Sequence, residues 1–228
     1  MKQPLVIITG ASSGIGAALA QAFSKAGYPL GLLARSKEKM EQLALPKACC
    51  LEVDVTDQAS FKKVITQAEA KFGPVDCLIN NAGFGNSGKF TELPDEEDEQ
   101  MIQVNLQGVI HGMKAVLPGM ETRKSGTIIN ISSLADRNAR PHLATYAATK
   151  AAVKSLSESL RMEHAKNGIR ICNVAPAKVK TPLLNQSGLT QDQVMEAADF
   201  AKIVLWIYQQ PQGICIRDLV VAPTYYEE

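Results

Sequence analysis

The stretch Thr9-Gly10-Ala11-Ser12-Ser13-Gly14-Ile15-Gly16 follows the first apolar run of the chain, Leu5–Thr9, and precedes a helical pattern. A glycine-rich turn in this place lets the backbone approach a pyrophosphate, and the helix after it offers free N–H groups and the positive end of its dipole. The spacing is G-x3-G-x-G, which differs from the commoner dinucleotide spacing G-x-G-x-x-G. Such a loop can also be an ordinary tight turn, but its place after the first strand favours phosphate binding.

Apolar runs alternate with helical patterns along the rest of the chain. Most of the runs are apolar on both faces, as in strands buried between two layers of helices, and the alternation indicates a parallel sheet with right-handed crossovers. We predict an α/β protein with one doubly wound Rossmann domain over residues 1–228, in which helices flank a seven-stranded parallel sheet and ligands bind at the carboxyl ends of its strands. The expected strands are Leu5–Thr9, Leu30–Ala34, Cys49–Val53, Asp76–Asn80, Thr127–Ser132, Arg170–Ala175 and Ile214–Val221.

Size and charge narrow the classes of partner. The 228 residues carry 24 Lys and Arg against 23 Asp and Glu, so the net charge of +1 gives no broad attraction to nucleic acid or to an anionic membrane. No apolar run is long enough to span a bilayer, and residues 1–4 lack the apolar helix of a signal peptide. We therefore expect a cytoplasmic protein that acts on a small molecule.

Two other features read as structural. The five cysteines show no C-x-x-C or metal-type spacing and lie in apolar runs, so we expect buried thiols. The acidic run Asp95–Glu99 follows Pro94 and begins a helical pattern that reaches about Leu117, just before Pro118. Acids in a first helical turn complement the helix dipole, whereas five consecutive acids on a helix point in all directions. No metal site is predicted.

The residues with the clearest chemistry are Tyr146 and Lys150. Their i, i+4 spacing on a helical pattern places the phenol and the ammonium on one helix face. A nearby cation favours phenolate, so we expect the pKa of Tyr146 to fall toward neutrality, where a general acid/base works best. Ser133, just past a strand end, could hydrogen-bond a substrate oxygen. Taken alone, the pattern could also be a surface Tyr–Lys pair.

The fourth expected strand ends in Asn80-Asn81-Ala82-Gly83. Small residues at this edge would leave space for a flat adenosine, although Asn and Gly also favour an ordinary turn. The order of glycine-rich loop, Asn-Asn-Ala-Gly, Ser133 and Tyr146/Lys150 resembles the short-chain dehydrogenase/reductase family over nearly the whole chain.

This resemblance implies further site residues. It adds Asn105, in Gln103-Val-Asn-Leu-Gln-Gly108, to a catalytic set with Ser133, Tyr146 and Lys150. By composition alone, Asn105 reads as a helix-bending polar residue. The resemblance also implies that Asp54, followed by Val55, contacts the adenine. The alternative for Asp54 is a helix cap, for which Thr56 and Asp57 are better placed.

The resemblance implies a mechanism as well. Lys150 holds the nicotinamide ribose and lowers the pKa of Tyr146, while Ser133 orients the substrate oxygen. Asn105 positions a water that links Lys150 to solvent. In reduction, a hydride reaches the carbonyl carbon and Tyr146 gives a proton to the oxygen; oxidation reverses both transfers.

The second expected strand ends Leu32-Leu33-Ala34-Arg35-Ser36 and lacks the carboxylate that would bind the ribose 2′-hydroxyl of NAD. Arg35 can pair with a 2′-phosphate and Ser12 can donate to it, so NADP (NADPH) is favoured over NAD. The alternative is that Arg35 is a solvated charge. The residues expected to bind the cofactor are Gly10, Ser12, Ser13, Gly14, Ile15, Gly16, Arg35, Asp54, Val55, Asn81, Ala82, Gly83, Tyr146, Lys150, Pro176, Val179 and Thr181.

The substrate side is less defined. Pro176-Ala177 stands where most family members have Pro-Gly, and Ala enters positive φ less freely. Residues 182–198 are short for the family's lid, which suggests a small or open site. The tail 214–224 resembles the branch that acts on serine and other 3-hydroxy acids. Other candidate pocket residues are Phe84, Asn86, Arg140, His142 and Lys178; Arg140 or Lys178 could pair with a carboxylate or be a surface charge.

We therefore predict an NADP(H)-dependent oxidoreductase that interconverts a small alcohol or hydroxy acid and its ketone or aldehyde. One alternative is a 3-oxoacyl-thioester reductase, which would need a basic patch for a carrier protein that we cannot locate. Another is a non-catalytic nucleotide sensor, against which the intact catalytic set argues. The family also implies a homodimer or homotetramer, through helices near residues 96–117 and 146–167.

Overall fold

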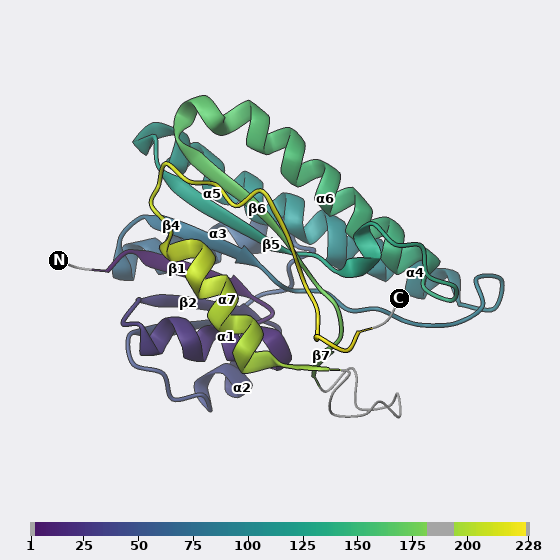
Figure 1. Cartoon of the computed structure of the whole chain (residues 1–228). Coiled ribbons are helices and arrows are strands. Elements are labelled where there is room, and N and C mark those ends of the chain that lie inside the picture. The colour runs from purple at the N-terminus through teal and green to yellow at the C-terminus, as the bar shows by residue number, and fades with distance from the viewer. Residues whose placement is uncertain (1–2, 182–193, 227–228) are drawn as a thin grey trace.

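A seven-stranded parallel sheet forms the centre of the molecule in the computed structural model, which describes residues 3–181 and 194–226 (Figure 1). Its strand order is β3-β2-β1-β4-β5-β6-β9, and every neighbouring pair is parallel. The predicted fold class is confirmed. The strands are β1 Leu5–Thr9, β2 Leu30–Ala34, β3 Ala48–Glu52, β4 Val75–Asn80, β5 Gly126–Ile131, β6 Ile169–Pro176 and β9 Asp218–Val221.

Helices cover both faces of this sheet, which explains why its central strands are apolar on both sides. Helices α1 (Gly14–Lys25) and α7 (Ala197–Gln209) pack together over one face, in a core that includes Phe23 and Phe200. The other face is covered by α3 (Gln58–Phe72), α5 (Gly108–Arg123) and α6 (Ala144–His164). Short helices occupy Lys37–Glu41 (α2), Leu134–Asp136 (η2) and Ala165–Asn167 (η3).

The strand order creates a crevice at the carboxyl ends of β1 and β4. The chain leaves β1 toward β2 and β3, then returns to the opposite side of β1 as β4, so the connections diverge between these two strands. Side chains tie the two strand ends together. The Thr9 hydroxyl accepts hydrogen bonds from the backbone N–H groups of Asn81 (2.9 Å) and Ala82 (3.0 Å), and Asn81 Nδ2 donates to the Thr9 carbonyl at 3.0 Å. The glycine-rich turn and the Asn-Asn-Ala-Gly segment therefore form one edge of the crevice.

The long helical segment after the acidic run differs from the expected one. The acids do occupy the first turn of α4 (Asp95–Ile102), but a π-helical turn, η1 (Gln103–Gln107), follows, and α5 continues through Pro118 to Arg123. The predicted end before Pro118 was wrong. Pro118 lies on the exposed side of α5, where water can satisfy the carbonyl that loses its partner, while neighbouring apolar side chains hold the helix against the sheet.

Smaller differences concern the last strand, a separate pair of short strands and the cysteines. Strand β9 begins at Asp218, four residues later than expected, and two short strands, β7 (Val179–Lys180) and β8 (Met195–Glu196), form a separate parallel pair. Most of the expected lid, residues 182–193, lies outside the described residues. The cysteine prediction was only partly right, since Cys77 and Cys172 are buried whereas Cys49, Cys50 and Cys215 are partly exposed.

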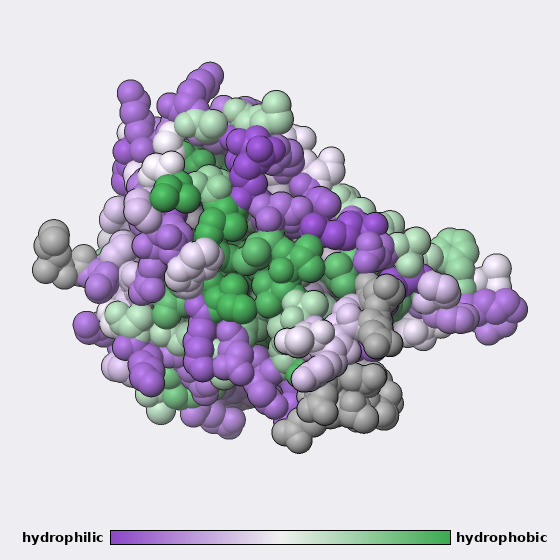
Figure 2. Space-filling view, viewed as in Figure 1, coloured by the Kyte–Doolittle hydropathy of each residue, from purple (hydrophilic) through white to green (hydrophobic). Residues whose placement is uncertain are grey.

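The free edge of the sheet carries apolar surface. Figure 2 shows an apolar patch, bordered by hydrophilic side chains, over the region where β9 and α7 lie in Figure 1. Ile214 and Val220 are exposed by 51% and 41% at this edge. Within the described ranges, no helix combines the length and the apolar character needed to cross a membrane.

Candidate active site

The glycine-rich turn is built from residues that allow a very close approach of backbone to backbone. Gly10 and Gly14 have positive φ angles of 65° and 52°, which L-residues with a side chain rarely adopt. Gly16 lies so near the turn that a Cβ atom there would be 2.1 Å from the Gly10 carbonyl oxygen. Helix α1 begins at Gly14, directly after this turn, so its free N–H groups point into the crevice end as the sequence predicted.

One part of the crevice lies at the ends of β2 and β3. It joins the glycine-rich turn to Arg35 and Asp54, both exposed, and to Val55 and Ala82. The Asp54 carboxylate accepts hydrogen bonds from the Thr56 N–H (2.9 Å) and hydroxyl (2.8 Å). The helix cap that follows is Asp57, as expected, because its side chain accepts from Ala59 N and Ser60 N at 3.0 Å.

Lys39 is a residue that the sequence reasoning missed. Its side chain lines the same cavity as Ser12 and Arg35, which makes two cations on one wall. The signal was present in the sequence, since Lys39 follows Arg35 by only four residues, in the short helix that comes directly after this strand end. A paired positive wall suits an anionic group better than a single exposed arginine.

The second part of the crevice lies at the ends of β4, β5 and β6 and holds the reactive side chains. Ser133 and Tyr146 reach it together with Lys150, from the loop after β5 and from α6. Its lining comprises Gly10, Ser13, Gly14, Ile15, Asn81, Gly83, Phe84, Ile131, Ser132, Ser133, Tyr146, Lys150, Pro176, Ala177, Val179 and Thr181. Most of the expected nicotinamide-side residues therefore meet in one place.

The aromatic ring of Tyr146 is fixed by packing. A Cβ atom on Gly85 would lie 2.7 Å from Tyr146 Cδ2, so the ring packs directly on this glycine. The expected fall in the pKa of Tyr146 is wrong for the chain alone. Burial raises the pKa, the nearby Ser133 side chain lowers it, and the charge of Asp136 raises it. The Lys150 ammonium lies 5.7 Å from the ring centroid and does not reverse this balance.

Lys150 is a buried cation. Its Nζ donates to the Ile131 carbonyl at 3.0 Å and lies within contact range of Gly83, where a Cβ atom would be 3.5 Å away. Burial lowers the pKa of Lys150 to about 8, and the charge of Asp136 opposes that fall. Lys150 is thus the group in this pocket whose charge changes just above neutral pH.

The two neighbouring serines have different partners. Ser133 caps η2 and accepts from Ala135 N at 3.2 Å, and its side chain lies near enough to Tyr146 to lower the pKa of that phenol. Ser132 is buried, and its hydroxyl points back to the Lys150 carbonyl at 3.4 Å. Only Ser133 therefore acts on the phenol.

Asn105 is fully buried in the π-helical turn η1. Its amide donates to the Phe84 carbonyl (2.8 Å) and to Thr149 Oγ1 (3.3 Å), and its oxygen accepts from Phe84 N (3.0 Å). The extra residue in a π-helical turn redirects side chains and is frequent at functional sites. Asn105 thereby joins η1, the loop after β4 and α6 beside Lys150, rather than lining the open pocket.

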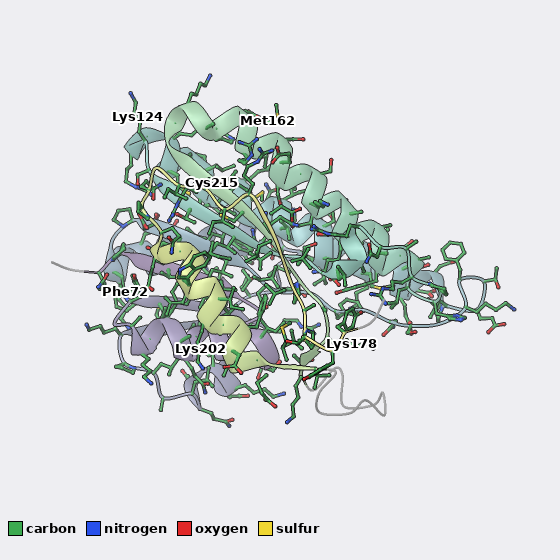
Figure 3. All side chains as sticks on the ribbon, viewed as in Figure 1. Phe72, Lys124, Met162, Lys178, Lys202 and Cys215 are labelled. Atoms are coloured by element: carbon green, nitrogen blue, oxygen red, sulfur yellow. The ribbon has the colours of Figure 1, made fainter. Side chains whose placement is uncertain are left out.

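Residues farther out form the rim. Asn86 hydrogen-bonds Glu97, and His142 is exposed at a turn with a positive φ of 65°. Arg140 donates to the Tyr226 hydroxyl at 2.7 Å, and Lys178 lies over the same ring at 5.6 Å. Figure 3 places Lys178 beyond the carboxyl end of β6, near β7. Two cations thus contact Tyr226 of the C-terminal tail, and one of them, Lys178, lies between the pocket residues Ala177 and Val179.

Comparison with known proteins agrees with this geometry. Residues 4–192 match the family model described as short chain dehydrogenase. The chain belongs to the short-chain dehydrogenase family. An uncharacterized oxidoreductase of Listeria monocytogenes is 37% identical over 248 aligned positions that cover 98% of both chains. The chain is therefore an oxidoreductase of this family.

Two solved structures of the short-chain dehydrogenase family have the same fold over almost their full length. An alcohol dehydrogenase from the archaeon Thermococcus sibiricus, complexed with 5-hydroxy-NADP, superimposes with a TM-score of 0.92 at 27% identity, covering 99% of both chains. A closed form of serine dehydrogenase complexed with NADP+ also has a TM-score of 0.92, at 26% identity, covering 98% of this chain and 96% of the other.

Proposed function

We propose that this oxidoreductase uses NADP(H) to interconvert a small alcohol or hydroxy acid and its ketone or aldehyde, with Ser133, Tyr146, Lys150 and Asn105 as its catalytic set. The observation that carries the proposal is a pair of adjoining pockets, whose linings share Gly10, Ser13, Gly83 and Phe84. Together they join the glycine-rich turn to Ser133, Tyr146 and Lys150 at one end and to Arg35 and Lys39 at the other.

The residues present fit such a dinucleotide. The bare backbone of the turn, where a Cβ on Gly16 would collide with Gly10, and the N-terminus of α1 suit a pyrophosphate. Ser12, Arg35 and Lys39 share one wall that suits a 2′-phosphate, and Asp54 with Val55 lies at the adenine end. Both solved relatives described above carry an NADP-type cofactor. The pocket lined by Pro176, Val179 and Thr181 would take the nicotinamide end.

In the proposed mechanism the protein positions the substrate oxygen and moves one proton. The bound cofactor supplies or accepts the hydride. Ser133 holds the carbonyl or hydroxyl oxygen near Tyr146, and Tyr146 donates its phenolic proton to that oxygen during reduction. Because burial raises the pKa of Tyr146, the phenol of the chain alone carries the proton that reduction requires. Lys150 holds its positive charge close to the Tyr146 ring, and Asn105 fixes the helix turn behind it.

The proposed substrate class is supported by two cationic residues. Lys178 stands between Ala177 and Val179 of the pocket lining, and Arg140 contacts the same Tyr226 ring as Lys178, so this positive charge near the pocket suits a substrate with a carboxylate. The serine dehydrogenase neighbour acts on a small hydroxy acid, as its name states, and this supports the same class here.

The test is the oxidation of NADPH in the presence of an activated carbonyl compound, followed by a screen of hydroxy acids, sugars and ketones at the cofactor absorbance. The proposal expects turnover above the background rate. NADPH binding without turnover on any member of the screen would favour a nucleotide sensor instead.

The two serines provide the first prediction. Ser133→Ala removes a hydroxyl that lines the same pocket as Tyr146, so we expect the kcat/KM to fall by roughly tenfold to hundredfold, the worth of a hydrogen bond to a developing charge. Ser132→Ala, the matched control, removes only a long bond to the Lys150 carbonyl and should cost much less. Equal losses in steady-state assays, or a greater loss in Ser132→Ala, would show that Ser133 does not orient the substrate.

We also propose a homodimer or homotetramer. Phe90, Ile102 and Leu106 line an apolar groove where α4, η1 and α6 meet, and Phe90 and Ile102 are exposed by 62% and 47%. Met162, exposed by 67%, lies on the outer side of α6 (Figure 3). Such apolar faces are typical of subunit interfaces. Ile102→Asp should lower the molar mass measured by light scattering; a wild-type protein that is monomeric at all concentrations contradicts the proposal.

A further inference from the structure

A buried carboxylate lies directly behind the Ser133 turn. Asp136 is 6% exposed and closes η2, where its N–H donates to the Ser133 carbonyl at 2.9 Å. Arg137 donates hydrogen bonds to both carboxylate oxygens of Asp136, from Nε at 2.6 Å and from Nη2 at 3.2 Å. Asn173, from β6, donates to Asp136 Oδ2 at 2.9 Å. The carboxylate orientation is therefore fixed from two elements.

The same contacts extend to the edge of the sheet. Arg137 forms a forked pair with Asp218 on β9, at 2.7 and 3.0 Å, and Asn173 Nδ2 is 3.0 Å from Asp218 Oδ1. Lys154, one helical turn after Lys150 on α6, lies 3.7 Å from Asp218. This charge cluster of Asp136, Arg137, Asn173, Asp218 and Lys154 joins η2, β6, β9 and α6.

Stability alone is a weak reason for such a cluster. Removing charges from water costs much of what their attraction returns, so apolar side chains of similar size often stabilise a fold as well. A buried ionic group instead fixes one arrangement of the chain and sets the electric field around it. Here the neighbours of that field are Ser133, Tyr146 and Lys150.

We propose that Asp136 is a positioning residue for the reaction: held by Arg137 and Asn173, it fixes the turn that presents Ser133 and applies its negative charge to Lys150 and Tyr146. The inference rests on the proposed function for its role in turnover. Its electrostatic part concerns the protein itself and can be measured without a substrate.

Among the described groups around Lys150, Asp136 is the one whose charge acts on the pKa of the lysine. Ile131 offers a carbonyl from β5, and Tyr146 offers its ring. Asn105 and Lys150 both approach Gly83, where a Cβ atom would be 3.0 Å from Asn105 Oδ1 and 3.5 Å from Lys150 Nζ. Among the described residues, the charge that acts on the pKa of Lys150 is that of Asp136, which raises it against burial. Asp136 raises the pKa of Tyr146 as well.

The direction of the Lys150 pKa shift in each variant follows from the charge that the substitution removes. Asp136→Asn removes a negative charge, so the pKa of Lys150 should fall further below its usual range. Arg137→Gln removes the positive charge that partly offsets Asp136, so the pKa of Lys150 should rise. Each shift should be about half to one pH unit, the size of a unit charge acting across a partly polar interior. Two neighbouring substitutions are thus expected to act in opposite directions.

The experiment is competitive labelling of the lysine amines with acetic anhydride across pH, read by mass spectrometry on the full chain with and without NADPH. Lys150 lines the crevice, so a small reagent can reach it. Asp199→Asn is the matched control, because Asp199 is an exposed acid paired with Lys202 on α7. Where the protein reduces a carbonyl, the alkaline limb of the pH–rate profile should move with the labelling: downward in Asp136→Asn, upward in Arg137→Gln, and unchanged in Asp199→Asn.

Shifts in the same direction for both variants, or no shift, overturn the proposal. If Asp136→Asn does not fold, Arg137→Gln decides by its upward shift. Failure of both to fold makes the cluster a purely structural ion-pair network and also overturns the proposal. A wild type that turns over no carbonyl, yet shows the opposite labelling shifts, refutes the proposed function and leaves the role of Asp136 toward Lys150 standing.

Discussion

Tyr146→Phe should reduce the kcat for carbonyl reduction by roughly 10²–10⁴-fold, the usual contribution of a general acid. The substitution removes one oxygen and keeps the ring that packs on Gly85, so the fold and the shape of the pocket should persist. The phenol is protonated at neutral pH in the chain, and phenylalanine has no proton to give. The affinity for NADPH should change little, because we expect the glycine-rich turn and Arg35 to be its main anchors. Steady-state kinetics and fluorescence titration measure the two quantities separately.

Tyr225→Phe is the matched control for this substitution. Tyr225 is 73% exposed near the end of the chain, so the same chemical change there should leave the kcat unaltered. A Tyr146→Phe enzyme within a few fold of wild type would remove Tyr146 from the proton transfer. A loss of NADPH affinity equal to the loss of kcat would make Tyr146 a cofactor anchor instead.

The sheet could be predicted because several of its strands are short, continuous apolar runs. Strands β1 and β2, for example, are five-residue apolar runs bounded by turn residues, and burial on both faces leaves no other arrangement for such runs. Strand β9 was harder to place. It lies at the sheet edge, where Ile214 is apolar yet exposed and outside the ladder, so the apolar run is longer than the strand.

Helix ends depended on tertiary contacts that a local pattern does not contain. Pro118 is a strong local stop signal, but α5 passes through it because its buried side chains continue to pack beyond that point. The π-helical turn at Asn105 also depends on contacts between residues that are far apart in the sequence. The bonds from Asn105 to Phe84 and Thr149 join residues 21 and 44 positions apart, so the sequence could show a polar residue in a helix but not its partners.

The functional site likewise has one part that the sequence predicted and another that it did not. Motif residues such as Ser133 and Lys150 were found because their spacing along one element sets their relative position. The cluster around Asp136 was missed because Asp136 meets Asn173, and Arg137 meets Asp218, only after β5, β6 and β9 assemble. The pKa of Tyr146 was mispredicted for a related reason. Spacing showed that a cation was near, but the burial that outweighs it is a property of the folded chain.

The preference between the two nicotinamide cofactors should depend on Arg35. Arg35 is exposed at the end of β2, on a cavity wall shared with Ser12 and Lys39, and no carboxylate follows that strand to bind a 2′-hydroxyl. A guanidinium makes forked, charge-assisted hydrogen bonds to a phosphate, which we expect to favour NADPH over NADH by about tenfold to hundredfold. Solvent screening limits this gain, and rising salt should weaken NADPH binding more than NADH binding.

Arg35→Asp should therefore act on both cofactors at once. It repels a 2′-phosphate and offers an acceptor to a 2′-hydroxyl, so the ratio of kcat/KM for NADPH to that for NADH should fall by roughly 10²–10³-fold. Lys39 remains in this variant and retains part of the phosphate affinity, so Lys39→Asp alone should shift the ratio less, and the double variant more. Lys202→Asp, on the outer side of α7, is the matched control for the change of charge and should leave the ratio unchanged. A wild type that prefers NADH, or an Arg35→Asp enzyme with the wild-type ratio, would mean that Arg35 is a solvated surface charge and that NADP is not the favoured cofactor.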